Sequence, residues 1–176
     1  MIERREFRPL QAEEIAKEFQ NAGVDYLFIG KSGAILLGYP GTTQDVDVFP
    51  ARSSENGRRI VAALKNMGFE ISPELEREIV MGKDFVQIKS GPFDVDFVFA
   101  PDGIESFAAA KSRAVQEGIF QVANIRDIIA SKRASGRKKD ELELPLLESF
   151  RVEYEKLHAK PLRSSAEISD QNSRLG

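Results

Sequence analysis

Cysteine and histidine, the usual protein ligands of transition metals, are almost missing from this chain of 176 residues. With no cysteine, the protein has no disulfide, no thiol nucleophile and no Cys-ligated zinc or iron–sulfur site. Its single histidine, His158, cannot build a His-rich metal site, and we expect it to be a surface residue. Any metal that the protein binds is therefore expected to be a hard cation held by carboxylates.

Long apolar runs and a strong excess of one charge are also absent. No stretch approaches the length of a membrane span, and residues 1–19 are too charged for a signal peptide. We therefore expect a cytoplasmic protein with no membrane partner. The net charge is only −3 with the charges interspersed, so contact with nucleic acid would need a local basic patch.

The hydrophobic periodicity predicts an α/β (α+β) fold, with a sheet in the first two thirds and helices behind it. We expect one domain over residues 1–157, with a core at 20–100, a helical C-terminal segment at 104–157 and a flexible polar tail at 158–176. The expected helices are residues 11–21, 32–37, 53–68, 104–117, 125–133 and 140–157, and the expected strands are residues 24–30, 43–49, 84–89 and 93–99. Ser90-Gly91-Pro92 is expected to join the last two strands in a hairpin.

The tripeptide Gly30-Lys31-Ser32 has the ending of a P-loop that binds phosphates. Such a loop needs a glycine five positions earlier, and that position holds Asp25, a carboxylate where a polyphosphate would lie. The sequence therefore excludes a P-loop. A glycine at a strand-to-helix turn still lets a phosphate approach the backbone, and the serine is either a phosphate contact or a helix N-cap.

Carboxylates occupy alternate positions along two of the expected strands. Asp45 and Asp47 share one face of the first strand, about 6–7 Å apart, and Asp94 and Asp96 repeat the pattern on the second. Like charges that face one way repel each other unless a cation or solvent lies between them. The pattern indicates a divalent metal site, most naturally for Mg²⁺, and the alternative is two unrelated solvated strand faces.

These parts, in this order, resemble the nucleotidyltransferase-fold superfamily. The matching residues are Ile29-Gly30-Lys31, a spacer, Asp45-Val46-Asp47-Val48, and a third acid, Asp96, within "VDFVF". The stretches "IGKSGAILLGYPGTTQDVDVF" and "ANIRDIIASKRASGRKKDELELPLL" are similar to stand-alone bacterial members related to abortive-infection and toxin–antitoxin nucleotidyltransferases. The resemblance covers roughly residues 20–150 and implies a small mixed sheet of the polymerase-beta-like kind with flanking helices.

The resemblance also implies an activity, the Mg²⁺-dependent transfer of a nucleoside monophosphate from an NTP such as ATP to a hydroxyl. Asp45, Asp47 and Asp96 would be the catalytic metal ligands, with Asp94 as a possible substitute for Asp96 and Mn²⁺ as a possible metal. The nucleotide would be bound by Gly30, Lys31, Ser32, Thr43, Lys132 and Arg137. Lys31 departs from the family pattern, which has glycine or serine there. Asp140 would anchor the closing segment through Arg137 or lie close to the site.

The acceptor suggested by the resemblance is RNA, such as a tRNA end, a protein side chain or a small molecule. A cognate partner protein is expected if the chain acts in a toxin–antitoxin or defence system. The alternative function is a catalytically silent regulatory module, antitoxin-like, that keeps the nucleotide and the metal. A sugar-nucleotide transferase that uses Asp-x-Asp with Mn²⁺ fits less well, because few residues precede Asp45 in which to build its nucleotide-binding sheet.

Overall fold

The structure is a computed structural model and describes residues 9–159, so most of the expected tail lies outside the described residues. The helices are α1 (Pro9–Ala22), α2 (Gly30–Leu36), α3 (Ser54–Asn66), α4 (Pro73–Met81), α5 (Phe107–Arg113), α6 (Ile125–Ser135) and α7 (Lys138–His158). The strands are β1 (Tyr26–Ile29), β2 (Asp45–Pro50), β3 (Phe85–Ile88), β4 (Asp94–Val98), β5 (Val115–Glu117) and β6 (Phe120–Val122).

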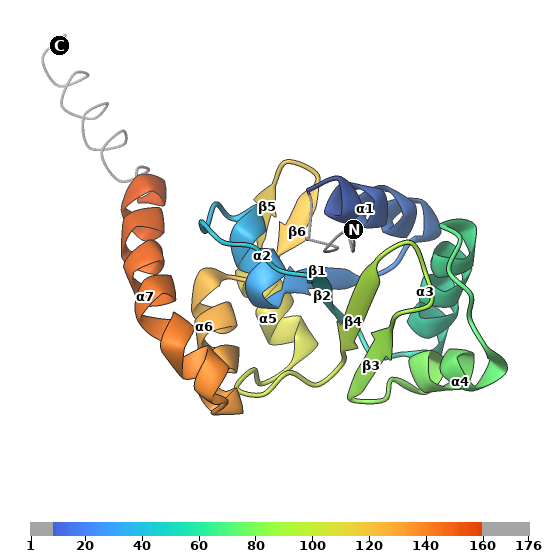
Figure 1. The fold of residues 1–176 in the computed structure, drawn as a ribbon. Helices are drawn as coiled ribbons and strands as arrows, with labels where there is room; N and C mark the ends of the chain where they lie inside the picture. The colour runs from blue at the N-terminus through green and yellow to red at the C-terminus, as the bar shows by residue number, and fades with distance from the viewer. Residues whose placement is uncertain (1–8, 160–176) are drawn as a thin grey trace, which may run out of the picture.

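The strands form one mixed sheet in the order β3-β4-β2-β1-β6-β5 (Figure 1). β2 pairs with β4 in parallel and with β1 antiparallel, while β1 and β6 are parallel. The expected hairpin of β3 and β4 is present as an antiparallel pair. The expectation of a mixed sheet with flanking helices is therefore confirmed.

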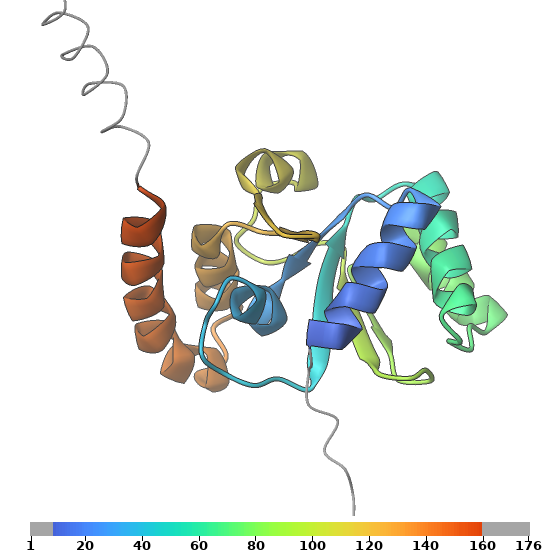
Figure 2. The same ribbon diagram turned by 90° about the horizontal axis from the view of Figure 1, so that it is seen from above.

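One face of the sheet is covered by α1 and α3, which lie together on the same side (Figure 2). Ile15 and Phe19 of α1 are fully buried, and the Phe19 ring stacks on Phe97 of β4 with centroids 6.3 Å apart. Val46 and Val48 of β2 are fully buried and alternate with the two aspartates. The apolar side of the acidic strands therefore forms the core, and the carboxylates face the other side of the sheet.

Helices α2, α5, α6 and α7 lie on that second side (Figures 1 and 2). Phe49 of β2 packs edge-on against Phe107 of α5, with centroids 5.2 Å apart. The long helix α7 lies against α6 and buries Leu147, while α6 buries Ile128 and Ile129. α7 is thus the outermost layer on the side of the sheet that carries the acids.

Two sequence expectations need correction. The helix expected over residues 104–117 is present only as α5, over residues 107–113, and β5 and β6 follow it as a short hairpin. β6 exists because it pairs with β1, with Phe28 opposite Val122, so long-range pairing overrides the local helical pattern. Helix α4 was not expected, although Ser72 caps its start and Pro73 is its first residue.

None of the helices within residues 9–159 has the length and apolar character that a membrane span requires.

Candidate functional site

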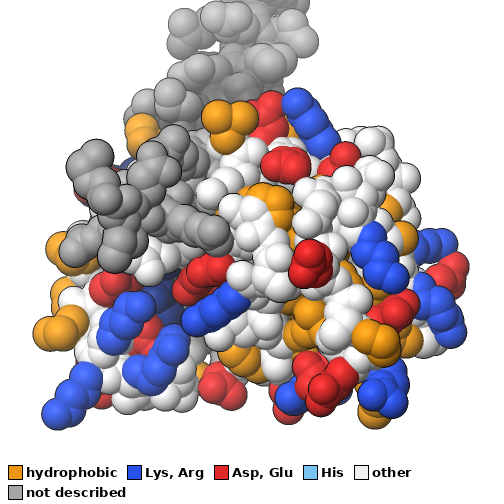
Figure 3. Space-filling view, turned by 45° about the vertical axis from the view of Figure 1, so that its right-hand side comes forward, with side chains coloured by type: hydrophobic (Ala, Val, Ile, Leu, Met, Phe, Trp, Pro, Cys, Tyr) orange, Lys and Arg blue, Asp and Glu red, His pale blue; other side chains and the backbone are white. Residues whose placement is uncertain are grey.

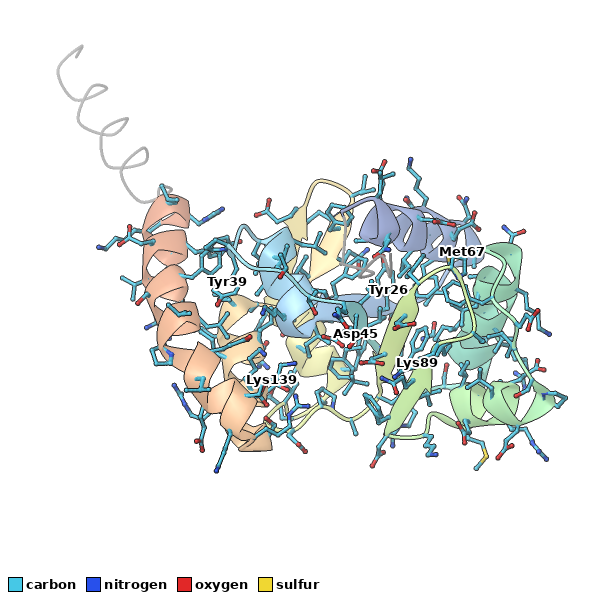
Figure 4. The ribbon with its side chains drawn as sticks, viewed as in Figure 1. Tyr26, Tyr39, Asp45, Met67, Lys89 and Lys139 are labelled. Atoms are coloured by element: carbon cyan, nitrogen blue, oxygen red, sulfur yellow. The ribbon has the colours of Figure 1, made fainter. Side chains whose placement is uncertain are left out.

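The two acidic strands lie side by side, and their aspartates are in register. In the parallel pairing of β2 with β4, Asp45 is opposite Asp94 and Asp47 is opposite Asp96. Neighbouring strands are about 4.8 Å apart, so these four carboxylates occupy one small area of the sheet. Figure 4 shows Asp45 at the centre of the molecule, between β4 on one side and the helices α6 and α7 on the other.

Burial and mutual repulsion make Asp47 and Asp96 hard to ionise. Loss of hydration, followed by the charges of Asp96 and Asp45, raises the pKa of Asp47 to about 8, against the opposing effect of Lys132 and Arg137. Loss of hydration, followed by the charge of Asp45, raises the pKa of Asp96 to about 6. At neutral pH, Asp47 therefore keeps its proton in the absence of a cation.

One oxygen of Asp96 has no hydrogen-bond partner although it is buried. The residue is only 7% exposed, and its Oδ1 contacts no donor. Gln87 of β3, directly opposite Asp96 in the sheet, lowers the pKa of the carboxyl by a hydrogen bond, as Lys89 does by its charge. A buried acceptor without a donor is unfavourable, so this oxygen is available for a ligand that enters the site.

Gly30 lies at the turn from β1 into α2, directly beside the Asp47 side chain. Its φ of +66° is in the left-handed region, which glycine adopts at little cost. A Cβ placed on Gly30 would collide with Oδ2 of Asp47. Only glycine therefore leaves room for the carboxylate at this turn. Asp25 lies at the opposite end of β1, where it pairs with Lys111 at 2.5 Å.

Ser32 links this turn to the acidic strand. Its fully buried hydroxyl accepts a hydrogen bond from the backbone N–H of Asp47 at 2.9 Å and donates one to the carbonyl of Ile29 at 3.1 Å. Of the two roles considered for Ser32, the N-cap is wrong, because Ile29 occupies the cap position of α2. In the structure, Ser32 fixes the backbone of Asp47 against the turn.

Lysines from α2 and α6 meet acidic residues of α7 beside the site. Lys31 Nζ lies 2.9 Å from Glu143 Oε1, and Lys132 Nζ lies 3.3 Å from Glu143 Oε2 and 3.5 Å from Asp140 Oδ1. Arg137 Nε donates to Asp140 at 2.7 Å, so the expected contact between these two residues is present at the start of α7. Because Lys132 and Arg137 both lower the pKa of Asp47, this cluster acts electrostatically on the acids.

Thr43 and His158 remain of the residues singled out from the sequence, and they lie in the loop before β2 and at the end of α7. Thr43 is half-buried in the loop that leads into β2. Lys139 and Lys89 lie on opposite sides of Asp45 (Figure 4). Figure 3 shows a further face of the molecule, on which Lys and Arg side chains gather beside acidic ones at the lower left. His158 is half-exposed and stacks on Tyr154, on the surface as expected.

Sequence reasoning missed Glu143 and Gln87. The spacing of Asp140 and Glu143 at i and i+3 could have revealed Glu143, because it places both on one side of a helix. Gln87 has no such signal, since its position beside Asp96 depends on the register of β3 with β4.

The acids do not form a finished metal site in the structure. Among residues 9–159, no three Asp, Glu, His or Cys side chains are arranged to hold an ion as they stand. The chemistry of the donors nevertheless fits a hard cation, because they are carboxylates, two of them resist ionisation, and one buried oxygen is unpaired. The metal stays a prediction.

Comparison with known proteins identifies a fold but no family. No protein-family model matches the sequence, and no curated protein matches it. Among solved structures, the crystal structure of JHP933 from Helicobacter pylori is similar, with a TM-score of 0.50 and 16% sequence identity. The match covers 82% of this chain and 68% of JHP933. At this identity the similarity concerns the fold alone.

Proposed function

We propose that the protein is a Mg²⁺-dependent nucleotidyltransferase that transfers a nucleoside monophosphate from an NTP to an acceptor hydroxyl and releases pyrophosphate. The observation that carries the proposal is the in-register parallel pairing of β2 and β4. It places Asp47 beside Asp96, whose Oδ1 is buried and unpaired, on the side of the sheet that α6 and α7 cover. The proposal includes the polymerase-beta-like core that the sequence motifs resemble.

Asp45, Asp47 and Asp96 would hold the metal, with Asp94 adjacent to Asp45 in the sheet. Mg²⁺ prefers oxygen ligands, and Mn²⁺ accepts the same donors. The cation would remove the repulsion that raises the pKa of Asp47, so binding and ionisation favour each other. Because the side chains do not enclose an ion as they stand, they turn toward it on binding.

The residues around the metal would have distinct roles. Gly30 leaves room for the Asp47 carboxylate at the turn, and Ser32 holds the backbone of Asp47 in place. Lys31, Ser32 and Thr43 would bind the nucleotide with the glycine. Lys132 and Arg137 supply positive charge on the side of α6 and α7. Bound Mg²⁺ contributes charge neutralisation on the transferring phosphoryl group.

Asp96 is the residue that would accept the proton of the acceptor hydroxyl. Loss of hydration and the charge of Asp45 raise the pKa of Asp96 to about 6 in the absence of a metal, and a bound cation would lower it, so Asp96 would be ionised at neutral pH. The buried, unpaired Oδ1 has a free lone pair for that proton. Candidate acceptors are RNA, including a tRNA end, a protein side chain and a small molecule.

The test is incubation with each labelled NTP, Mg²⁺ and total cellular RNA or protein. We expect label transfer that is lost in Asp45→Asn and Asp47→Asn, whereas the matched exposed variant Asp102→Asn keeps it. Asparagine preserves the shape of the side chain, so the loss would report on the carboxylate charge. Equal transfer by the Asp47→Asn variant would refute the assignment.

A catalytically silent module that binds nucleotide and metal is the second candidate. It is favoured by the pairing of Lys31 and Lys132 with Glu143, which occupies both lysines in the structure. Mg²⁺-dependent NTP binding without transfer to any acceptor would support this module against the enzyme. Absence of metal-dependent NTP binding would refute both.

A further inference from the structure

One carboxylate connects the two lysines that the proposed function assigns to the nucleotide. Glu143 of α7 contacts Lys31 of α2 through Oε1 at 2.9 Å and Lys132 of α6 through Oε2 at 3.3 Å. The three side chains come from three different helices. The contact therefore ties α7 to both of its neighbours on the acidic side of the sheet.

Burial makes this contact stronger than an ordinary surface ion pair. The side chains of Lys31, Glu143 and Lys132 are 24%, 17% and 11% exposed. Salt and water screen such partly buried pairs less than they screen exposed ones. Burial alone would raise the pKa of Glu143, but the hydrogen bond from Lys31 and the charge of Lys132 hold it below its ordinary value. Glu143 is thus ionised at neutral pH.

The neighbouring acid, Asp140, differs from Glu143 in its partners. Asp140 is hydrogen-bonded by Ser135 and by Arg137 in addition to its contact with Lys132. It would keep these two donors if Lys132 moved toward another anion. Glu143 would lose contacts with both lysines at once, so it is the acid that competes directly for them.

We infer that Glu143 is an internal competitor of the nucleotide, a carboxylate that occupies the lysines and that polyphosphate must displace. The inference rests on the proposed function for the assignment of Lys31 and Lys132 to phosphate. Because both ammonium groups lie within bonding distance of one carboxylate, one phosphate group can bridge them in the same way. A polyphosphate carries more negative charge than a carboxylate, which allows it to replace Glu143.

Displacement has a consequence for ligand choice. Every ligand that uses the two lysines must first break their contacts with Glu143. A triphosphate chain compensates for this loss with several charged oxygens, whereas a weakly charged ligand does not. Glu143 therefore determines specificity for polyphosphate, and removal of its charge should strengthen polyphosphate binding.

The experiment uses inorganic tripolyphosphate as the probe and isothermal titration calorimetry as the measurement. Glu143→Gln keeps the shape of the side chain and removes its charge. We expect it to bind the probe at least about tenfold more tightly than the unchanged protein, a difference of about 1.4 kcal/mol. Glu143→Asp, whose shorter side chain cannot span both lysines, should lie between the two and serves if the glutamine variant does not fold.

The matched control is Glu141→Gln, which makes the same charge change on the exposed side of the same helix. Unchanged or weaker binding by Glu143→Gln would overturn the inference, and so would an equal gain in Glu141→Gln. Failure of every variant to bind tripolyphosphate would also overturn it. A gain in Glu143→Gln without nucleotide transfer would leave the inference standing and refute the proposed enzyme.

Discussion

Replacement of Asp47 by asparagine should make the protein more stable at neutral pH when no metal is present. The pKa of Asp47 is about 8 in the folded chain, whereas the ordinary pKa of an aspartate is 3.8. Between these values the folded state binds more protons than the unfolded state, so the free energy of unfolding falls as the pH rises. An asparagine cannot ionise and removes this dependence.

The size of the effect follows from the width of that pH window. Each pH unit corresponds to about 1.4 kcal/mol, so from pH 3.8 to pH 7 the loss of stability is at most about 4 kcal/mol. Asp47 is partly accessible to water, which reduces the cost of its charge. We therefore expect Asp47→Asn to raise the free energy of unfolding at pH 7 by about 2–4 kcal/mol.

Urea unfolding followed by circular dichroism, at pH 5, 6, 7 and 8 with a chelator present, measures this difference. The stability of the unchanged protein should fall along the series, and that of Asp47→Asn should fall much less. Asp102→Asn, the same chemical change at an exposed residue, should follow the unchanged protein. A free energy of unfolding for Asp47→Asn at or below that of the unchanged protein at pH 7 would refute the reasoning.

Three further expectations concern the same centre. Mg²⁺ should raise the urea midpoint of the unchanged protein at pH 8 but not that of Asp47→Asn, and equal shifts would contradict Asp47 as a ligand. Gly30→Ala should cost about 2–5 kcal/mol by strain and collision, while Gly118→Ala, with similar φ and open space around it, should cost only about 1–2 kcal/mol in the same assay. Ser32→Ala should cost about 1–3 kcal/mol by removing the hydrogen bonds of Ser32 to the backbone of Ile29 and Asp47, against under about 1 kcal/mol for the exposed Ser112→Ala. Equal losses within either pair would contradict the roles given to Gly30 and Ser32.

The acidic strands could be predicted because their signal is local. Alternation of aspartate with valine and phenylalanine over a few residues defines a strand with one polar face. The sequence does not contain the parallel pairing that places Asp47 opposite Asp96. That register depends on how α3, α4 and β3, which separate the two strands in the sequence, pack in the folded chain, and no short pattern encodes this packing.

The missed elements have two different causes. Helix α4 carries readable signals, the capping Ser72, Pro73 as its first residue and the left-handed Gly82 at its end, so a closer reading would have found it. β5 and β6 have three residues each, too short for a period to show, and they are stabilised by pairing with each other and with β1. Such short strands cannot be predicted from their own sequences alone.

The lysines illustrate a third limit. Lys31 and Lys132 could be singled out from the sequence, but their shared contact with Glu143 could not. It arises because α2, α6 and α7 pack together, and packing follows from the whole apolar pattern. Charge pairs between distant helices therefore require a structure.

The parallel pairing of β2 with β4 also bears on how the chain folds. The acids come together only when the chain between the strands, which includes α3, α4 and β3, has closed into a loop. Repulsion between the carboxylates opposes that one long-range step and leaves the β3–β4 hairpin, formed locally, largely unaffected. The rate at which the strands join should therefore depend on pH and on divalent cations, so the chemistry of the site is coupled to the kinetics of folding.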